Sequence, residues 1–200
     1  LITTNDVLVS LDHWQGVTSI DAEEKWVEVK SGTKLLKLGN DLWSLGLSME
    51  NLGDIDVQSI AGALNTGTHG TGNNFGTLAT QIHSITIALP TGELVEVNET
   101  ENNDLFKAAQ ISLGALGIIT RYKLKVVKAF RLEYTSKLGK VRDAIDNYDK
   151  YNNDNRNFEF YWFPHTKEVQ LKLVNETTKP IQDGGFMRDF DDIVLENIGY

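Results

Sequence analysis

Alternating apolar and polar positions mark the first strands that we expect along the chain. Residues 25–30, Lys-Trp-Val-Glu-Val-Lys, alternate cleanly, which is typical of a strand with one buried face. Residues 7–11, Val-Leu-Val-Ser-Leu, are also rich in β-favouring side chains. Both stretches predict strands, and Gly16 with the polar stretch 21–24 supplies the connection.

A helix is predicted next, because apolar residues recur at helical spacing from Leu35 to Leu45. Ser31 is a candidate N-cap, and Gly46 is expected to end the helix.

The middle of the chain predicts a hairpin and a second helix. Residues 83–89 and 93–97 are extended patterns separated by Pro90-Thr91-Gly92, a turn sequence. Asn103 or Asp104 can cap a helix running to Leu113 and stopping at the glycines of 114–117. Residues 118–127 are extended again. We therefore expect an α+β unit whose strands are antiparallel neighbours.

Beyond residue 127 the pattern changes, and we place a domain boundary there. Residues 130–134 are extended, and the apolar positions between 141 and 151 have helical spacing. Residues 158–163 and 168–174 predict a second hairpin. The polar tail, 177–200, carries no element that its pattern predicts.

Composition excludes several classes of function. The chain has 200 residues, 40% of them hydrophobic and 24% charged, which is typical of a folded globular protein. Its net charge is −9, so a phosphate-neutralising surface for nucleic acid is not expected. Disulfides and thiolate chemistry are excluded because the chain has no cysteine, and no apolar run is long enough to span a membrane. An anionic ligand would have to be bound by local neutral donors.

The candidate site is a glycine- and threonine-rich stretch at residues 59–72. Glycines allow close backbone approach and hydroxyls can donate to phosphate oxygens, so the stretch can bind a dinucleotide without lysine or arginine. It has neither the Gly-Lys-Ser/Thr ending of a Walker loop nor the spacing of a Rossmann turn. The alternative is a glycine-rich connection needed only for tight turns.

Individual side chains do not define a catalytic centre. His69 lies among the glycines, where a catalytic base, a ligand contact and a structural hydrogen bond are all open. Asp54 and Asp56 are on one side of an extended stretch, but turn carboxylates explain them equally well. No histidine spacing matches a metal site, so we predict none and leave the catalytic residues unassigned.

Residues 52–63 followed by Thr66-Gly67-Thr68-His69-Gly70 resemble the flavin-binding signature of the sugar-1,4-lactone oxidases and alditol oxidases, in the vanillyl-alcohol oxidase superfamily. The resemblance includes residues 31–33 and 46–48 upstream, and 113–120, which are similar to the family's second flavin-contacting segment. Residues 158–166 are similar to the first strands of its substrate, or cap, domain. The resemblance therefore covers most of the chain.

The resemblance implies FAD as the cofactor and a fold of two parts. Residues 1–127 would be the second subdomain of a PCMH-type FAD-binding domain, a mainly antiparallel sheet flanked by helices, and residues 128–200 the beginning of an α+β cap domain. The residues implied in binding FAD, the last two through their backbone, are Asp54, Ser59, Gly62, Thr66, Gly67, Thr68, His69, Gly70, Ile118 and Ile119.

The implied reaction oxidises a hydroxyl of a sugar-1,4-lactone or alditol, with hydride passing to the flavin and then to oxygen or another acceptor. The partners would be a small sugar lactone or polyol and the acceptor, with no nucleic acid, and we expect a cytoplasmic location. The family's Gly-x-Gly-His-Ser pyrophosphate loop has no counterpart in the sequence, so we expect a fragment of the oxidoreductase. A dehydrogenase that excludes oxygen, or a non-catalytic nucleotide- or carbohydrate-binding module with the same fold, are the alternatives.

Overall fold

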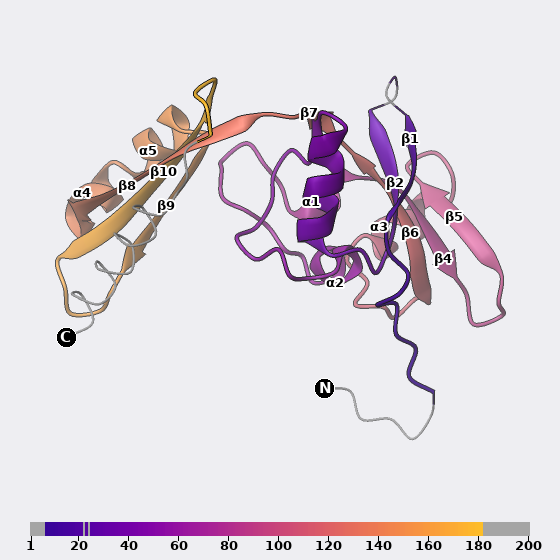
Figure 1. Cartoon of the computed structure of the whole chain (residues 1–200). Coiled ribbons are helices and arrows are strands. Elements are labelled where there is room, and N and C mark those ends of the chain that lie inside the picture. The colour runs from indigo at the N-terminus through magenta and orange to yellow at the C-terminus, as the bar shows by residue number, and fades with distance from the viewer. Residues whose placement is uncertain (1–6, 22, 24, 182–200) are drawn as a thin grey trace. The chain divides into compact units, whose positions relative to one another are not determined.

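A computed structural model describes residues 7–181 of the protein apart from residues 22 and 24 (Figure 1). The chain divides into two compact units. The first runs to Gly70 and resumes from Gly76 to Ala129, and the second contains Thr71–Phe75 and the chain from Phe130 onward. Each unit has its own hydrophobic core.

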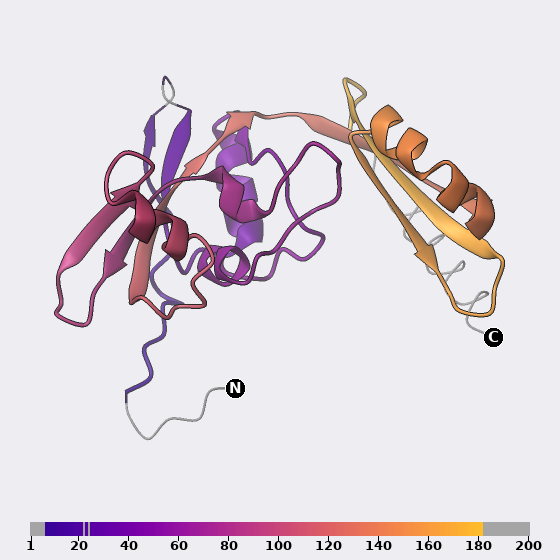
Figure 2. The same ribbon diagram turned by 180° about the vertical axis from the view of Figure 1, so that it is seen from behind.

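The first unit is built on a five-stranded sheet in which every neighbouring pair is antiparallel (Figure 2). The strand order is β1-β2-β6-β4-β5. The strands are β1 Val17–Asp21, β2 Trp26–Lys30, β4 Ile82–Ala88, β5 Leu94–Asn98 and β6 Ile118–Lys125. A short pair, β3 Leu47–Ser48 with β7 Val127–Lys128, lies outside this sheet.

Helices cover one face of the five-stranded sheet and form the larger core with it. They are α1 Leu35–Ser44, α2 Ile60–Asn65, α3 Asn103–Ala109 and the 3-10 turn η1 Leu78–Gln81. Alternation explains the arrangement: Val27 and Val29 of β2 are fully buried against this layer, whereas Glu28 between them points to the opposite face.

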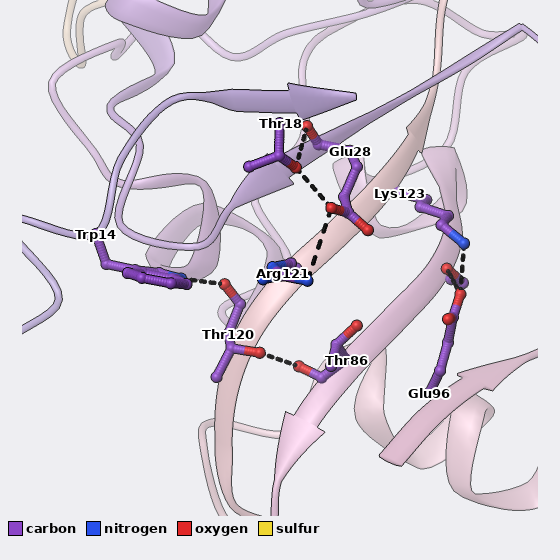
Figure 3. Close-up of polar contacts among 9 residues, drawn as sticks. Trp14, Thr18, Glu28, Thr86, Glu96, Thr120, Arg121 and Lys123 are labelled. Atoms are coloured by element: carbon purple, nitrogen blue, oxygen red, sulfur yellow. Dashed lines mark hydrogen bonds and ion pairs between the residues drawn. The ribbon is translucent and has the colours of Figure 1, made fainter. Parts of the chain in front are cut away.

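The opposite face of the sheet is polar and is held by contacts across the strands (Figure 3). Arg121 Nη1 lies 3.9 Å from Glu28 Oε1, and Lys123 Nζ forms an ion pair with Glu96 Oε1 over 2.7 Å. The Trp14 indole N–H donates to the carbonyl of Thr120, on the central strand β6, over 2.8 Å. The segment before β1 is thereby fastened to β6.

The second unit is a three-stranded antiparallel sheet in the order β8-β10-β9, with two short helices. Its core contains Ala144, Phe158, Val169 and Leu171. The elements are β8 Arg131–Lys140, α4 Val141–Asp146, α5 Tyr148–Asp154, β9 Asn157–Trp162 and β10 Glu168–Thr177.

The α+β fold class with antiparallel sheets is confirmed, as are the alternating strand at 25–30 and both hairpins. Gly92, in the predicted turn of the first hairpin, has φ +86°, which only glycine adopts without strain. Gly46 follows α1 with φ +72°, as expected of a residue that ends a helix. The correspondence of the units to an FAD subdomain and a cap domain stays a prediction.

Several local predictions were wrong. Residues 7–11 form no strand, since Val7 and Leu8 are 86% and 79% exposed with no neighbouring strand, and the first strand is β1 instead. Ser31 is buried and does not cap α1, whose N-cap is Lys34.

The later helices also differ from their predictions. The helix expected to reach Leu113 ends at Ala109, and its N-cap is Asn102. The helix expected over 141–151 is two helices, because the backbone leaves helical geometry at Asn147, with φ −110° and ψ 18°. Most of the polar tail lies outside the described residues.

Candidate functional site

The glycine-rich stretch begins on α2, which is fixed by hydrogen bonds to the loop that enters α1. The amides of Leu35 and Leu36 donate to the carbonyls of Gln58 and Asp56, each over 2.9 Å. In return, the amide of Ile60 donates to Thr33 over 2.7 Å. These reciprocal bonds set where α2 starts and hold Ser59 as its N-cap.

The first turn of α2 uses its own backbone donors inside the protein. Ser59 Oγ accepts from the Gly62 amide over 3.2 Å, and the amide of Ala61 donates to the Ser31 carbonyl over 3.0 Å. With the bond from Ile60, three amides that a helix N-terminus commonly offers to an anion are therefore committed. Accepting a bond does not use the hydrogen of the Ser59 hydroxyl, which can still be donated.

The loop after α2 turns sharply at Gly67, which has φ +70°. The amides of Gly67 and Thr68 donate back to Leu64 and Ala63, over 3.2 and 3.0 Å. The space beside Gly67 is open, because a side chain there would meet only the end of Ile111, at 3.7 Å. A ligand can therefore approach this part of the backbone closely.

Gly70 is enclosed, in contrast to Gly67. A Cβ at Gly70 would lie 2.1 Å from the Leu52 carbonyl oxygen and 2.9 Å from the side-chain amide of Asn51. Gly53 is close to the same loop, since a Cβ there would be 3.1 Å from the His69 carbonyl oxygen. Gly70 therefore lets the loop pack tightly on the segment before α2, and Asp54 follows this contact as an exposed residue.

His69 is exposed, and its ring has a defined neighbour. Nδ1 lies 3.0 Å from the Gly70 carbonyl oxygen, which can only accept, so Nδ1 carries the hydrogen of this bond. In the neutral ring Nε2 is then the acceptor. The backbone of His69 forms an isolated antiparallel bridge with Thr77, which fixes the loop as it leaves the site.

The second predicted segment lies between α3 and β6 and contains several residues with left-handed backbone. Leu113 has φ +53° although it is not glycine, and Gly114 and Gly117 have φ +76° and +144°. Ile118 is 42% exposed, whereas Ile119 is buried and paired with Ile87 in the sheet. Any cofactor contact by Ile119 would come from its backbone.

The two segments are brought together by Asn65, which sequence reasoning missed. Its Oδ1 accepts from the Ser112 hydroxyl over 2.8 Å and from the Ser112 amide over 3.3 Å. Its Nδ2 donates to the Ala61 carbonyl over 2.9 Å and to the Tyr122 hydroxyl over 2.8 Å. Burial raises the pKa of Tyr122 far above its ordinary value, so this hydroxyl stays neutral.

Both segments also expose large apolar side chains, which the sequence alone did not show. Each residue is between 39% and 77% exposed: Leu52, Ile55 and Val57 in the first segment, and Ile111, Leu113 and Ile118 in the second. Exposed apolar groups together with glycines and hydroxyls suit a ligand that has flat apolar rings as well as phosphates.

The part of the chain that the structure describes lacks both a metal-binding cluster and a membrane-spanning helix. No group of three or more His, Asp or Glu side chains could hold a metal ion there. Among the same residues, no helix has the length and apolar character needed to cross a membrane.

Two family models match the chain, one to each part. Residues 1–98 match the FAD binding domain family, and residues 122–200 match the D-arabinono-1,4-lactone oxidase family.

Curated relatives have the same character. L-gulonolactone oxidase of Scyliorhinus torazame is 32% identical over 90% of this chain and 41% of its own length. D-arabinono-1,4-lactone oxidase of Eremothecium gossypii is 30% identical over 91% and 35%. L-gulono-1,4-lactone dehydrogenase of Mycobacterium tuberculosis is 33% identical over 87% and 40%. The chain thus spans about two fifths of the length of the curated relatives it matches.

Solved structures agree on the fold. A mutant of cholesterol oxidase from Brevibacterium sterolicum superposes with a TM-score of 0.76 at 20% identity, over 86% of this chain and 36% of that one. An alkyldihydroxyacetonephosphate synthase gives a TM-score of 0.68 at 18% identity, over 82% and 38%. The resemblance to the FAD-dependent sugar-1,4-lactone oxidases that the motifs indicated is confirmed by the two family models and by these relatives.

Proposed function

We propose that the first unit binds FAD along the two segments that Asn65 joins. The observation that carries the proposal is the direct bond between Asn65 and Ser112, because it places the two predicted flavin-contacting segments side by side. The match of residues 1–98 to an FAD binding domain supports the same cofactor.

The residues fit FAD, but hydroxyl groups rather than the amides of a helix N-terminus would bind its phosphates. Since the first-turn amides of α2 are committed, the hydroxyls of Ser59 and Thr68 are the donors that we assign to the pyrophosphate. Gly67 leaves room for close approach, since the nearest atom to a Cβ there is at 3.7 Å. A Cβ at Gly62 would lie 3.2 Å from Ser59 Oγ, so glycine at this position avoids crowding that hydroxyl.

The remaining predicted residues receive roles at the edges of this site. Thr66 Oγ donates to the Gly62 carbonyl and so holds the loop as it leaves α2, over 2.8 Å. Gly70 keeps the loop against Leu52, and His69 presents Nε2 as an acceptor. Asp54, Ile118 and the backbone of Ile119 complete the proposed contacts.

We further propose that the whole protein oxidises a hydroxyl of a sugar-1,4-lactone or polyol. When bound, FAD would supply the redox chemistry of this oxidation: the substrate carbon would lose a hydride to the flavin, the hydroxyl would lose its proton, and oxygen or another acceptor would reoxidise the cofactor. Residues 1–127 act as the second FAD subdomain and residues 128–200 begin the substrate domain. The names of the relatives, both oxidases and a dehydrogenase, support the substrate class and leave two acceptors to test. The cytoplasmic location stays a prediction.

The binding test compares two glycines with the same backbone conformation. Gly67 and Gly46 have φ +70° and +72°, and a Cβ at Gly46 meets nothing within 4 Å. Changing either one to alanine costs about 1 kcal/mol of backbone strain. We expect Gly67→Ala to weaken FAD binding, measured by flavin fluorescence quenching, and Gly46→Ala to bind like the unchanged protein. Equal FAD affinity in both variants, or no FAD uptake by the unchanged protein, would contradict the site.

The activity test uses the loaded protein without oxygen. Adding L-gulono-1,4-lactone, D-arabinono-1,4-lactone or an alditol should bleach the flavin absorption if that compound is a substrate. Admitting oxygen then separates an oxidase, whose colour returns rapidly, from a dehydrogenase, whose colour returns only with another acceptor. A flavin that none of these compounds reduces would contradict the proposed substrate class.

A further inference from the structure

Asn65 is the last residue of α2, and its side-chain amide is fully used. One oxygen accepts two bonds from Ser112, and one nitrogen donates to Ala61 and to Tyr122. The orientation of the amide follows from chemistry, because a backbone amide can only donate and a backbone carbonyl can only accept. Side-chain oxygen must therefore face Ser112 and side-chain nitrogen must face Ala61.

The side-chain amide of Asn65 joins the two predicted flavin-contacting segments. Asn65 immediately precedes the loop of Thr66 and Gly67, and Ser112 immediately precedes Leu113, whose backbone is left-handed. A left-handed non-glycine backbone costs about 1 kcal/mol or more and persists only when surrounding contacts impose it. The paired bonds from Ser112 to Asn65 hold the residue just before that strained position.

We infer that Asn65 is a positioning residue that sets the spacing between the two FAD-contacting segments. The inference rests on the FAD site proposed above. The bonds to Ser112 join the two segments, whereas the bond to Tyr122 joins α2 to β6 in the core. The first set therefore governs cofactor affinity, and the second governs the stability of the unit.

Three substitutions separate these contributions. Asn65→Leu has nearly the same size and removes every bond of the amide. Ser112→Ala removes only the hydroxyl bond to Asn65, and Tyr122→Phe removes only the bond to the core hydroxyl. Asn40→Ala, an exposed position on α1, is the matched control for changing an asparagine.

Hydrogen–deuterium exchange of the protein without FAD tests the positioning directly. We expect Asn65→Leu and Ser112→Ala to speed exchange at 66–70 and 112–117 together, and Tyr122→Phe and Asn40→Ala to leave those segments unchanged. Unchanged exchange at both segments in Asn65→Leu would overturn the inference, whether or not the protein binds FAD.

FAD titration then tests the consequence. Asn65→Leu should raise the dissociation constant of FAD at least tenfold, and Ser112→Ala should raise it severalfold. Adding Ser112→Ala to Asn65→Leu should raise it little further, because the bond between the two residues is already lost. Tyr122→Phe should lower the melting temperature and leave the dissociation constant within twofold. The inference would be overturned if Asn65→Leu bound FAD with normal affinity. It would also be overturned if Tyr122→Phe lost as much FAD affinity as Asn65→Leu. Failure of the unchanged protein to take up FAD would instead contradict the proposed function.

Discussion

The side chain of Gln81 binds the backbone of Asn51 through a buried hydrogen bond. Nε2 donates to the Asn51 carbonyl over 2.8 Å, while Oε1 accepts from the amide of Glu50 over 3.1 Å. Gln81, at the end of η1, thus pairs with the segment as a neighbouring strand would. That segment continues to Leu52, against which Gly70 packs, so Gln81 supports the loop that contains His69.

Gln81→Leu should destabilise the first unit. The change removes both bonds at a position that is 4% exposed, and losing buried hydrogen bonds of this kind costs about 1–3 kcal/mol. Urea unfolding measures the free energy. Gln15→Leu is the control, because the bond from Gln15 to the Asp12 carbonyl is solvent-accessible and its loss should cost a few tenths of a kcal/mol at most, roughly the size of ordinary surface effects. Equal losses in the two variants would refute the role of Gln81.

Gly70→Ala and Gly39→Ala should have opposite effects on stability. The Cβ at Gly70 would lie 2.1 Å from a backbone oxygen, so the loop must shift at a cost of about 1–3 kcal/mol. Gly39 lies inside α1 with nothing within 4 Å of its Cβ, and alanine there should stabilise the helix by about 1 kcal/mol. Thermal unfolding of both variants checks the signs. A Gly70→Ala protein as stable as the unchanged one would show that the loop packs less tightly than described.

Lys123→Met should lower stability in a pH-dependent way. The bond from the Lys123 ammonium lowers the pKa of Glu96 below its ordinary value of 4.5, and the Ser84 hydroxyl contributes in the same direction. A lowered carboxyl pKa stabilises the fold above the unfolded value, and this stabilisation is lost as the pH falls through the folded value. The carboxylate is 44% exposed, so we expect a difference of less than about 1 kcal/mol at pH 7.

Unfolding measured between pH 3 and about pH 7 should separate two parts of this loss, since the contact of Lys123 Nζ with the Trp26 ring, 5.0 Å from its centroid, does not depend on the charge of Glu96. The Glu96 part should vanish below the lowered pKa, while the Trp26 part persists. Lys125→Met, whose partner Glu99 is 4.0 Å away and 72% exposed, should show almost no dependence on pH in this range. The same pH profile in both variants would contradict the assignment.

Arg156→Lys should loosen the loop tip Thr71–Phe75 within the second unit. The guanidinium carbon lies 4.4 Å from the centroid of the Phe75 ring and 4.6 Å from that of Phe130, an arrangement that suits a flat cation better than an ammonium. We expect a loss of about 1 kcal/mol and faster proteolysis at the tip. Arg142→Lys is the control, because Arg142 is exposed and pairs with Asp146 of the same helix over 2.9 Å. Unchanged proteolysis in Arg156→Lys would show that the two rings do not depend on the guanidinium.

The sequence predicted the elements whose signal is local. The strand at 25–30 follows from alternation, and the turn at Gly92 follows from a residue type that fits a left-handed backbone. The strand predicted at residues 7–11 is absent, because β-favouring side chains form a strand only when a neighbouring strand pairs with them through backbone hydrogen bonds. The single helix predicted over 141–151 is interrupted at Asn147, although the helical spacing of apolar residues continues past it. The spacing of apolar residues does not determine the backbone angles of one residue between them.

The candidate site was predictable in its residue types and not in its connections. Glycines and hydroxyls at 59–72 indicated a dinucleotide site, yet nothing in the sequence reveals that the amides beside Ser59 bind inside the protein. Asn65 was missed because its partners, Ser112 and Tyr122, are 47 and 57 residues away. Only a fold brings such residues together.

The tip Thr71–Phe75 belongs to the second unit, although the chain on both sides of it belongs to the first. A polypeptide starting at Phe130 would therefore lack the ring of Phe75 and the carbonyl of Thr71, to which the Asn157 side chain donates. One ending at Ala129 would carry that tip without its partners. Dividing the chain between Ala129 and Phe130 therefore gives two polypeptides that each lack contacts of the second unit. Such a pair suits a complementation assay better than separate study of each part.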